Sequence, residues 1–262
     1  MEANAPLDAC PHEADEAPRT VAAGTLYGVG MGPGDPDLLT VKALRILQRA
    51  PVLVHFCKQG KRGNARGIAD AIFSDPSREM ALAYPYTTEL HPEHPDYVSA
   101  LATFYDEASD KLAGHLDAGR DVAILSEGDP FFYGSFMHLW RRLKDRFPVE
   151  VIPGVTGMSG CWTRAGTPIT WGDDVLTVLP ATLPLPVLTE RLKGTDAAVV
   201  MKLGRHLPKV RAALTEAGLL SRAVYVERGT MAGERVIPLE VKADDSAPYF
   251  SMVLVPGEGR RP

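Results

Sequence analysis

The stretch Gly28-Val29-Gly30-Met31-Gly32-Pro33-Gly34-Asp35-Pro36 decides the fold of this chain. It follows the apolar pair Leu26-Tyr27 and leads into Leu38-Leu39-Thr40, so it predicts a strand, a tight loop and the start of a helix. Four glycines in seven residues permit left-handed backbone and close approach to main-chain atoms, while the two prolines stiffen the loop. The stretch therefore predicts a rigid loop that can cradle a ligand.

The spacing of these glycines excludes two common nucleotide motifs. A dinucleotide fingerprint, G-x-G-x-x-G, would need a glycine at Pro33 or at Asp35. A phosphate-binding P-loop fails as well, because Gly60-Lys61 is followed by Arg62 and no glycine stands five residues before Gly60. Taken alone, the first loop could still be a glycine-rich turn without a ligand.

A second loop of the same kind is Ser126-Glu127-Gly128-Asp129-Pro130-Phe131-Phe132-Tyr133-Gly134. It also follows an apolar strand pattern, residues 122–125, and precedes a helical pattern. In an open α/β sheet, ligands bind outside the carboxyl ends of the strands. We therefore expect the two loops to line one crevice.

With the turn Ile152-Pro153-Gly154-Val155-Thr156-Gly157, the two loops make residues 24–256 resemble the tetrapyrrole methylases. Members of this family use S-adenosylmethionine to methylate corrin precursors of vitamin B12. Three motifs in this order make the resemblance specific. It implies an α/β fold of the class III methyltransferase type, with two α/β domains and a cofactor cleft between them.

The resemblance also implies which residues contact S-adenosylmethionine. These are Pro33, Glu127, Gly128, Asp129, Phe132, Thr156, Gly157, Met201 and Lys202. Gly157 departs from the Ala or Ser that is common at its position, and Met201 could instead fill space in the core. Because the cofactor carries the reactive methyl group, the protein has chiefly to align the reactants.

The segment from Lys58 to Arg66 contains four cations and no anion, which by itself indicates an exposed loop. The resemblance favours a second interpretation, in which Arg62, Arg66 and Arg205 hold substrate carboxylates. The implied reaction is methylation of metal-free precorrin-2 at C20. A cobalt-containing substrate, another ring position, diphthamide synthesis on a protein, and a non-catalytic tetrapyrrole carrier remain as alternatives.

The proton acceptor is open, with Asp35, Glu127 and Tyr133 as candidates because they lie in the two loops. Each could equally be a turn-forming residue. No metal site is expected, because His91 and His94 lie beside prolines and lack a third ligand nearby in sequence.

The sequence predicts a disordered acidic tail at residues 1–23, a domain with a parallel sheet at 24–166 and a domain with a mixed sheet at 167–262. Apolar runs predict further strands at 52–56, 122–125, 149–152, 175–179, 197–201, 223–226 and 249–255. Periodic patterns predict helices at 41–47, 97–116, 136–143 and 156–165.

Composition places the chain among ordinary globular proteins, with 45% hydrophobic and 23% charged residues. No apolar stretch approaches the roughly 20 residues that span a bilayer, and three cysteines without paired spacing favour the cytoplasm. A net charge of −5 argues against nucleic-acid binding. The family resemblance implies a homodimer.

Overall fold

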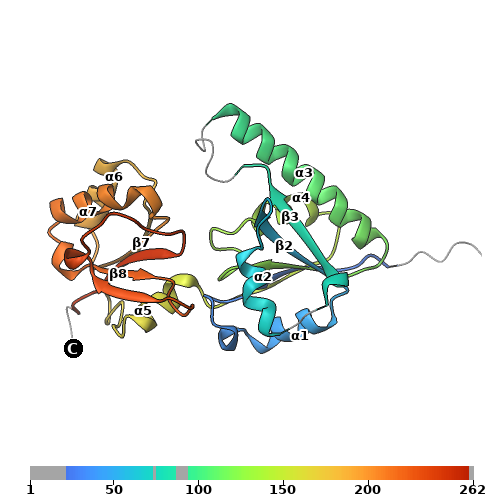
Figure 1. Ribbon diagram of the computed structural model, residues 1–262, viewed down its shortest axis with the longest axis horizontal. Coiled ribbons are helices and arrows are strands. Elements are labelled where there is room, and N and C mark those ends of the chain that lie inside the picture. Colours follow the sequence, from blue (N-terminus) through green and yellow to red (C-terminus); the bar gives the residue numbers. More distant parts are fainter. Residues whose placement is uncertain (1–21, 73–74, 87–93, 260–262) are drawn as a thin grey trace, which may run out of the picture.

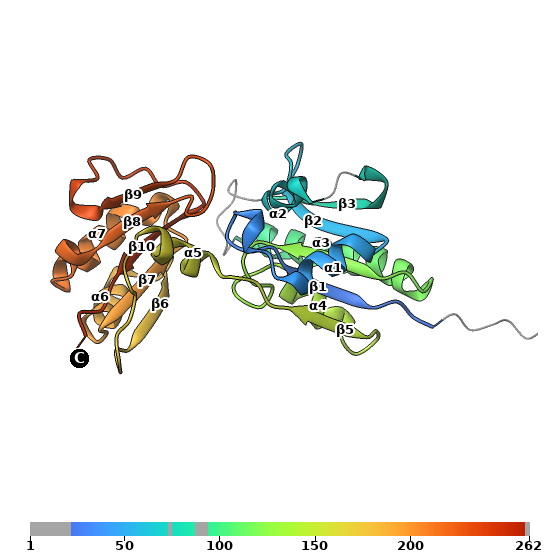
Figure 2. The same cartoon turned by 90° about the horizontal axis from the view of Figure 1, so that it is seen from below.

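Two β-sheets with their covering helices form two lobes that lie side by side in the computed structural model (Figures 1 and 2). The structure describes residues 22–72, 75–86 and 94–259. The predicted acidic tail lies outside these residues except for its last two positions, and so does His91.

The first sheet is entirely parallel, as predicted, with the strand order β3-β2-β4-β1-β5. Its strands are β1 (Leu26–Gly30), β2 (Val52–Lys58), β3 (Glu79–Tyr84), β4 (Val122–Ser126) and β5 (Val149–Ile152). Its helices are α1 (Val41–Arg49), α2 (Asn64–Ile68), α3 (Pro95–Asp117) and α4 (Phe136–Leu143). Helices α1 and α2 pack on one face of the sheet, while α3 and α4 pack on the other.

Local sequence signals define the ends of these helices. The Thr40 side chain accepts a hydrogen bond from the backbone N–H of Ala43 at 3.1 Å, which makes Thr40 the N-cap of α1. Gly119 follows α3 with a φ of 73° and donates its N–H to the carbonyl of Leu116. A residue with a side chain would be strained in this conformation, so glycine ends the helix here.

The second sheet is mixed, also as predicted, with the order β6-β7-β10-β8-β9. Its strands are β6 (Leu176–Pro180), β7 (Ala197–Met201), β8 (Val224–Glu227), β9 (Arg235–Pro238) and β10 (Ser251–Val255). Only β6 and β7 pair in parallel within it. Helices α6 (Leu185–Lys193) and α7 (Leu207–Glu216) cover one face.

Helix α5 (Gly157–Arg164) covers the other face of the second sheet. Cys161 is buried there with Val199, Val226 and Leu254, one from each of three neighbouring strands. By packing, α5 thus belongs with the second sheet, although the sequence-based division between residues 166 and 167 assigns it to the first domain. The packing favours a boundary before α5, and the exact division stays a prediction.

Strands β3 and β9 were not predicted. The ends of the strands predicted from residue 52 onward lie within two residues of the observed ends. Short 3₁₀ helices connect the larger elements at Pro36–Leu38, Ala69–Ala71, Pro76–Arg78, Gly204–His206, Leu220–Arg222 and Leu239–Val241.

Candidate functional site

The first and second glycine loops lie at the carboxyl edge of the first sheet, where β1 and β4 end. These strands are parallel neighbours, with Gly30 opposite Ser126 at their ends. The chain leaves β1 toward α1 on one face of the sheet and leaves β4 toward α4 on the other face. Loops that diverge from adjacent strands in this way leave a crevice where ligands bind in α/β proteins. The first and second glycine loops start at these two strand ends.

The three motifs predicted from the sequence meet at their glycines. Gly128 donates its backbone N–H to the carbonyl of Gly32 at 2.8 Å, and the two residues form an isolated β-bridge. A Cβ on Gly30 would lie 2.5 Å from the backbone nitrogen of Gly154 and 2.8 Å from the carbonyl oxygen of Gly128. Main chain thus packs directly on main chain, and no side chain fits between the loops.

Asp129 ties the second loop to the proline-glycine turn. One carboxylate oxygen accepts a hydrogen bond from the backbone N–H of Phe131 at 2.8 Å, and the other accepts from the N–H of Gly154 at 3.2 Å. Both oxygens are therefore used within the protein. The Asp129 side chain thus holds the second loop against the proline-glycine turn.

The remaining predicted cofactor residues of the first lobe and α5 lie beside these loops. Thr156 caps α5 by accepting from the N–H of Ser159, and a Cβ on Gly128 would lie 3.4 Å from the nitrogen of Gly157. The ring of Pro33 packs against Gly160 in α5. Phe132 lies three residues after Asp129 in the second loop, and the centre of its ring is 5.0 Å from the centre of the Tyr133 ring. The structure thus brings all three motifs together.

Lys202 reaches this region from the second lobe, and Met201, the residue before it, is the last residue of β7. Lys202 follows β7 with a φ of 60°, and its ammonium group lies 4.7 Å from the centre of the Tyr133 ring. Tyr133, in the second glycine loop, also has a left-handed backbone, with a φ of 56°. Strained conformations of this kind persist where surrounding structure holds them, often at functional sites. This cation–π contact joins the two lobes at the predicted cofactor site.

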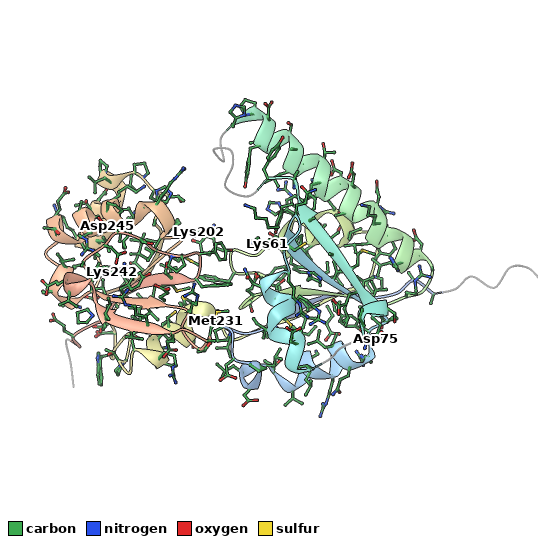
Figure 3. The ribbon with its side chains drawn as sticks, viewed as in Figure 1. Lys61, Asp75, Lys202, Met231, Lys242 and Asp245 are labelled. Atoms are coloured by element: carbon green, nitrogen blue, oxygen red, sulfur yellow. The ribbon has the colours of Figure 1, made fainter. Side chains whose placement is uncertain are left out.

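A cavity of about 470 Å³ opens between the lobes near the first loop. It is lined by residues of the first loop, of the segment around α2 and of the loop between β8 and β9, namely Gly34, Asp35, Pro36, Arg62, Gly63, Asn64, Gly67, Ile68, Thr230, Met231 and Ala232. Figure 3 shows Lys202 and Met231 at the border of the second lobe that faces the first lobe, and Lys61 on the first lobe.

Sequence reasoning missed the contribution of the loop from Thr230 to Ala232. The Met231 side chain occupies the space where a Cβ on Gly34 would lie, so this loop contacts the first glycine loop. The signal in the sequence was Arg228-Gly229-Thr230, which reads only as a polar turn. Arg228 and Thr230 both have left-handed backbone, with φ values of 49° and 70°.

The three arginines predicted to hold substrate occupy different environments. The Arg62 side chain is 57% exposed, lines the cavity and pairs with Asp70. Arg66 is buried, and its guanidinium lies 2.5 Å from carboxylate oxygens of both Asp70 and Glu79. Arg205 is exposed in a 3₁₀ helix of the second lobe. Arg66 is therefore engaged inside the protein, and the carboxylate-binding hypothesis rests on Arg62 and Arg205.

The three candidate proton acceptors also differ. The Asp35 carboxylate accepts from the N–H of Asp37 at 2.9 Å and caps a 3₁₀ helix. Tyr133 makes the contact with Lys202. Glu127 accepts from the N–H of Ala65 at 3.2 Å, and burial raises the pKa of its carboxyl.

Two features are absent from the described ranges. No group of three or more His, Cys, Asp or Glu side chains there could hold a metal ion. His94, one of the two histidines considered from sequence, caps α3 by accepting from the N–H of Asp96 at 3.3 Å. Across the same ranges, no helix is long and apolar enough to cross a membrane.

A parallel sheet and a mixed sheet, each with its own helices, define a two-lobed α/β protein with a cavity between the lobes. Three comparisons specify the class. Residues 25–243 match the model of the family described as Tetrapyrrole (Corrin/Porphyrin) Methylases. A precorrin-2 C(20)-methyltransferase of a Sinorhizobium species is 54% identical over 242 residues, which cover 92% of this chain and 99% of that protein.

Two solved structures share the fold. A cobalt precorrin-4 methyltransferase has a TM-score of 0.70 at 22% identity, over 92% of this chain and 98% of that one. Uroporphyrin-III C-methyl transferase from Thermus thermophilus, complexed with S-adenyl homocysteine, has a TM-score of 0.62 at 24% identity, over 89% and 92%. The chain belongs to the tetrapyrrole methylase family, as the three glycine motifs predicted.

Proposed function

We propose that this protein transfers the methyl group of S-adenosylmethionine to C20 of precorrin-2, which gives precorrin-3A in cobalamin biosynthesis. The observation that carries the proposal is the 54% identity to a precorrin-2 C(20)-methyltransferase over nearly the full length of both chains. The assembled loops support it, because a tetrapyrrole carrier would not need them. The C20 position and the metal-free substrate rest on this likeness.

The site fits S-adenosylmethionine because glycines leave the main chain of its loops without covering side chains. Gly30, Gly128 and Gly154 pack without side chains, and the left-handed backbone of Gly128 lets it bridge to Gly32 of the first loop. The cofactor supplies an electrophilic methyl group on a sulfonium. Main-chain atoms beside Pro33, Gly128 and Thr156, with the Met201-Lys202 turn, would hold and orient it. In-line alignment of this kind contributes up to about 7–11 kcal/mol in well-oriented reactions.

The substrate would lie across the cavity between the lobes. Precorrin-2 carries acetate and propionate groups around its rim, and Arg62 lines the cavity with an exposed guanidinium. Arg205 and Lys202 present further positive charge on the second lobe, where Figure 3 shows Lys202 at the border with the first lobe. Arginine suits this role because it binds carboxylates through two parallel hydrogen bonds.

The reaction is tested by incubating the protein with precorrin-2 and a methyl-¹³C-labelled donor, followed by NMR of the product. The label is expected at C20. A label at another carbon would overturn the substrate assignment. Calorimetry with S-adenosylhomocysteine separates an enzyme from a carrier, because a carrier is expected to show no binding.

Replacing Arg62 by alanine should weaken substrate binding without affecting the cofactor. A partly exposed charge-assisted pair contributes about 1.5 kcal/mol, so the KM for precorrin-2 is expected to rise about tenfold. The affinity for S-adenosylhomocysteine should stay the same, because Arg62 lies outside the three glycine motifs. The matched control is Arg45→Ala, an exposed arginine on α1. An unchanged KM in the Arg62 variant would remove the proposed carboxylate contact.

A homodimer is proposed on family grounds alone. Phe136 and Leu139, the apolar residues that could have marked an interface, are fully buried in the core of the first lobe. Sedimentation at micromolar concentration is expected to give twice the chain mass, and a monomer mass would contradict the proposal.

A further inference from the structure

The backbone at Arg62, on the wall of the cavity between the lobes, is fixed by the residues that follow it. A Cβ on Gly63 would overlap the carbonyl oxygen of Phe56, so only glycine fits against β2 at this point. Ala65, in the first turn of α2, donates its N–H to the Glu127 carboxylate at 3.2 Å. This bond ties α2 to the second glycine loop. The main chain that carries the Arg62 side chain therefore has a defined place beside the cavity.

The direction of the Arg62 side chain depends on Asp70. Among the described residues, Asp70 is the ion-pair partner of Arg62, and its Oδ1 atom accepts from Nη2 of the guanidinium. The Arg62 side chain is 57% exposed and the Asp70 side chain 44% exposed, so the pair by itself stabilises the fold little. A long, exposed arginine without such a partner samples many rotamers, and selecting one of them on ligand binding costs free energy. The contact with Asp70 selects one in advance.

Asp70 is itself held from inside the protein. The Oδ1 atom that accepts from Arg62 also accepts from Nη1 of Arg66 at 2.5 Å. The Arg66 side chain is only 5% exposed, and its Nη2 donates to Oε1 of Glu79, on β3, at 2.5 Å. Two charge-assisted hydrogen bonds in a buried position leave a guanidinium little freedom. Asp70 therefore links an immobilised arginine in the core of the first lobe to an arginine on the cavity wall.

A negative charge beside Arg62 also has an opposing effect, because it competes with a substrate carboxylate. Two features limit this competition. The buried Arg66 shares the same Asp70 oxygen, so the charge of one carboxylate is divided between two cations. The contact with Asp70 uses only Nη2 of Arg62, and no contact among the described residues occupies its Nη1 or Nε. These donors are available to a second carboxylate, so orientation of the guanidinium should outweigh competition.

We propose that Asp70 is a positioning residue for substrate binding, which holds the Arg62 guanidinium at the cavity in the orientation that receives a carboxylate of precorrin-2. This inference rests on the proposed function. Asp70 is not among the residues that line the cavity, so it acts through Arg62. The inference thus assigns the two carboxylates around Arg66 to different tasks: Glu79 stabilises the buried guanidinium, and Asp70 carries its fixed position outward to Arg62.

The experiment compares Asp70→Asn with wild type, both alone and combined with Arg62→Ala. Asparagine keeps the shape of the side chain and removes its charge. The KM for precorrin-2 is expected to rise about fivefold, which corresponds to about 1 kcal/mol, with kcat unchanged. In the Arg62→Ala background the same replacement should leave KM unchanged, because the side chain that Asp70 positions is gone.

Asp106→Asn is the matched control. Asp106 is an exposed aspartate on α3 that pairs at 2.7 Å with Arg142, and Arg142 does not line the cavity between the lobes. The control removes the same charge from the same kind of ion pair. It should leave the KM for precorrin-2 unchanged in both backgrounds.

A second readout does not depend on the reaction. NMR relaxation of ¹⁵N-labelled arginine side chains measures the order parameter of the Nε–H bond, which reports how restricted each guanidinium is. In Asp70→Asn the order parameter is expected to fall at Arg62 and to stay the same at Arg142. A fall at arginines throughout the protein would assign Asp70 to the stability of the fold and would overturn the inference.

Failure of the proposed function and failure of this inference give different results. If wild-type protein does not methylate precorrin-2, the proposed function fails, while the order parameter of Arg62 still decides whether Asp70 holds that side chain. If wild type is active and Asp70→Asn has an unchanged or lower KM, the inference is overturned, and a lower KM would show that Asp70 competes with the substrate. An equal rise in KM with and without Arg62 would also overturn it, because the effect would not pass through Arg62.

Discussion

Replacing Gly154 by alanine is expected to destroy the cofactor site and to destabilise the first lobe. A Cβ on Gly154 would overlap the carbonyl oxygen of Gly128 and lie 2.9 Å from the Cα of Gly30. Every atom it meets is backbone, so no side chain can move aside. Overpacking of this kind costs about 3 kcal/mol at the upper end of its usual range. The displaced loops should also weaken S-adenosylhomocysteine binding about 100-fold, since shifts near 1 Å have effects of that size.

The measurements are urea unfolding followed by circular dichroism, and calorimetry with S-adenosylhomocysteine. The matched control is Gly114→Ala on the exposed side of α3, where an added Cβ meets nothing within 4 Å. Alanine in a helix is more favourable than glycine, so this control should be stabilised by about 0.5–1 kcal/mol. A Gly154→Ala protein that binds S-adenosylhomocysteine as wild type does would show that the three loops need not pack backbone on backbone.

The second large effect is expected at Arg66, which the sequence assigned to substrate binding. Its buried guanidinium bonds to Asp70 and Glu79, and this contact holds the pKa of the Glu79 carboxyl below its usual range. Arg66→Ala would leave Glu79 with its charge uncompensated in a mostly buried position. Breaking a buried pair by removing one partner costs about 3–5 kcal/mol. The free energy of unfolding should fall by that amount at neutral pH.

The pH dependence of this loss follows from the lowered pKa. Glu79 contributes stability above its unfolded-state pKa of about 4.3, and this contribution is lost as pH falls through the lower folded-state value. The difference between wild type and Arg66→Ala should therefore shrink below about pH 4.3. Denaturant unfolding at several pH values measures it, and a difference that is constant across pH would contradict the ion-pair explanation.

Arg62→Ala is the matched control for stability, because Arg62 contacts the same Asp70 from an exposed position. Exposed pairs are worth about 0–1 kcal/mol. The two replacements should thus change different quantities: Arg62→Ala should change the KM for precorrin-2, and Arg66→Ala should change the free energy of unfolding. A double replacement would mix both effects and could not test the carboxylate contact.

Several elements could be predicted because their signals are local. The strands of the first sheet next to the glycine loops are buried on both sides and read as continuous apolar runs, such as residues 122–125. Helix α3 has its buried residues three or four apart and ends before Gly119. By contrast, β3 consists of Glu-Met-Ala-Leu-Ala-Tyr at a sheet edge, where only β2 pairs with it. Such a segment has weak strand propensity and depends on its partner.

The sequence by itself determined the three glycine motifs, their order, the family and the two α/β sheets, because glycine, proline and apolar periodicity act over a few residues. The tertiary structure decided what lies opposite those motifs. The packing of α5 on the second sheet, the contact of Lys202 with Tyr133, and the approach of Met231 to Gly34 join residues about 40 to 200 positions apart. The sequence also does not distinguish Arg62 from Arg66, because both lie in the same run of cations. Only the position of Asp70 and Glu79 buries one guanidinium and leaves the other at the cavity, since burial and charge pairing are set by neighbours in space.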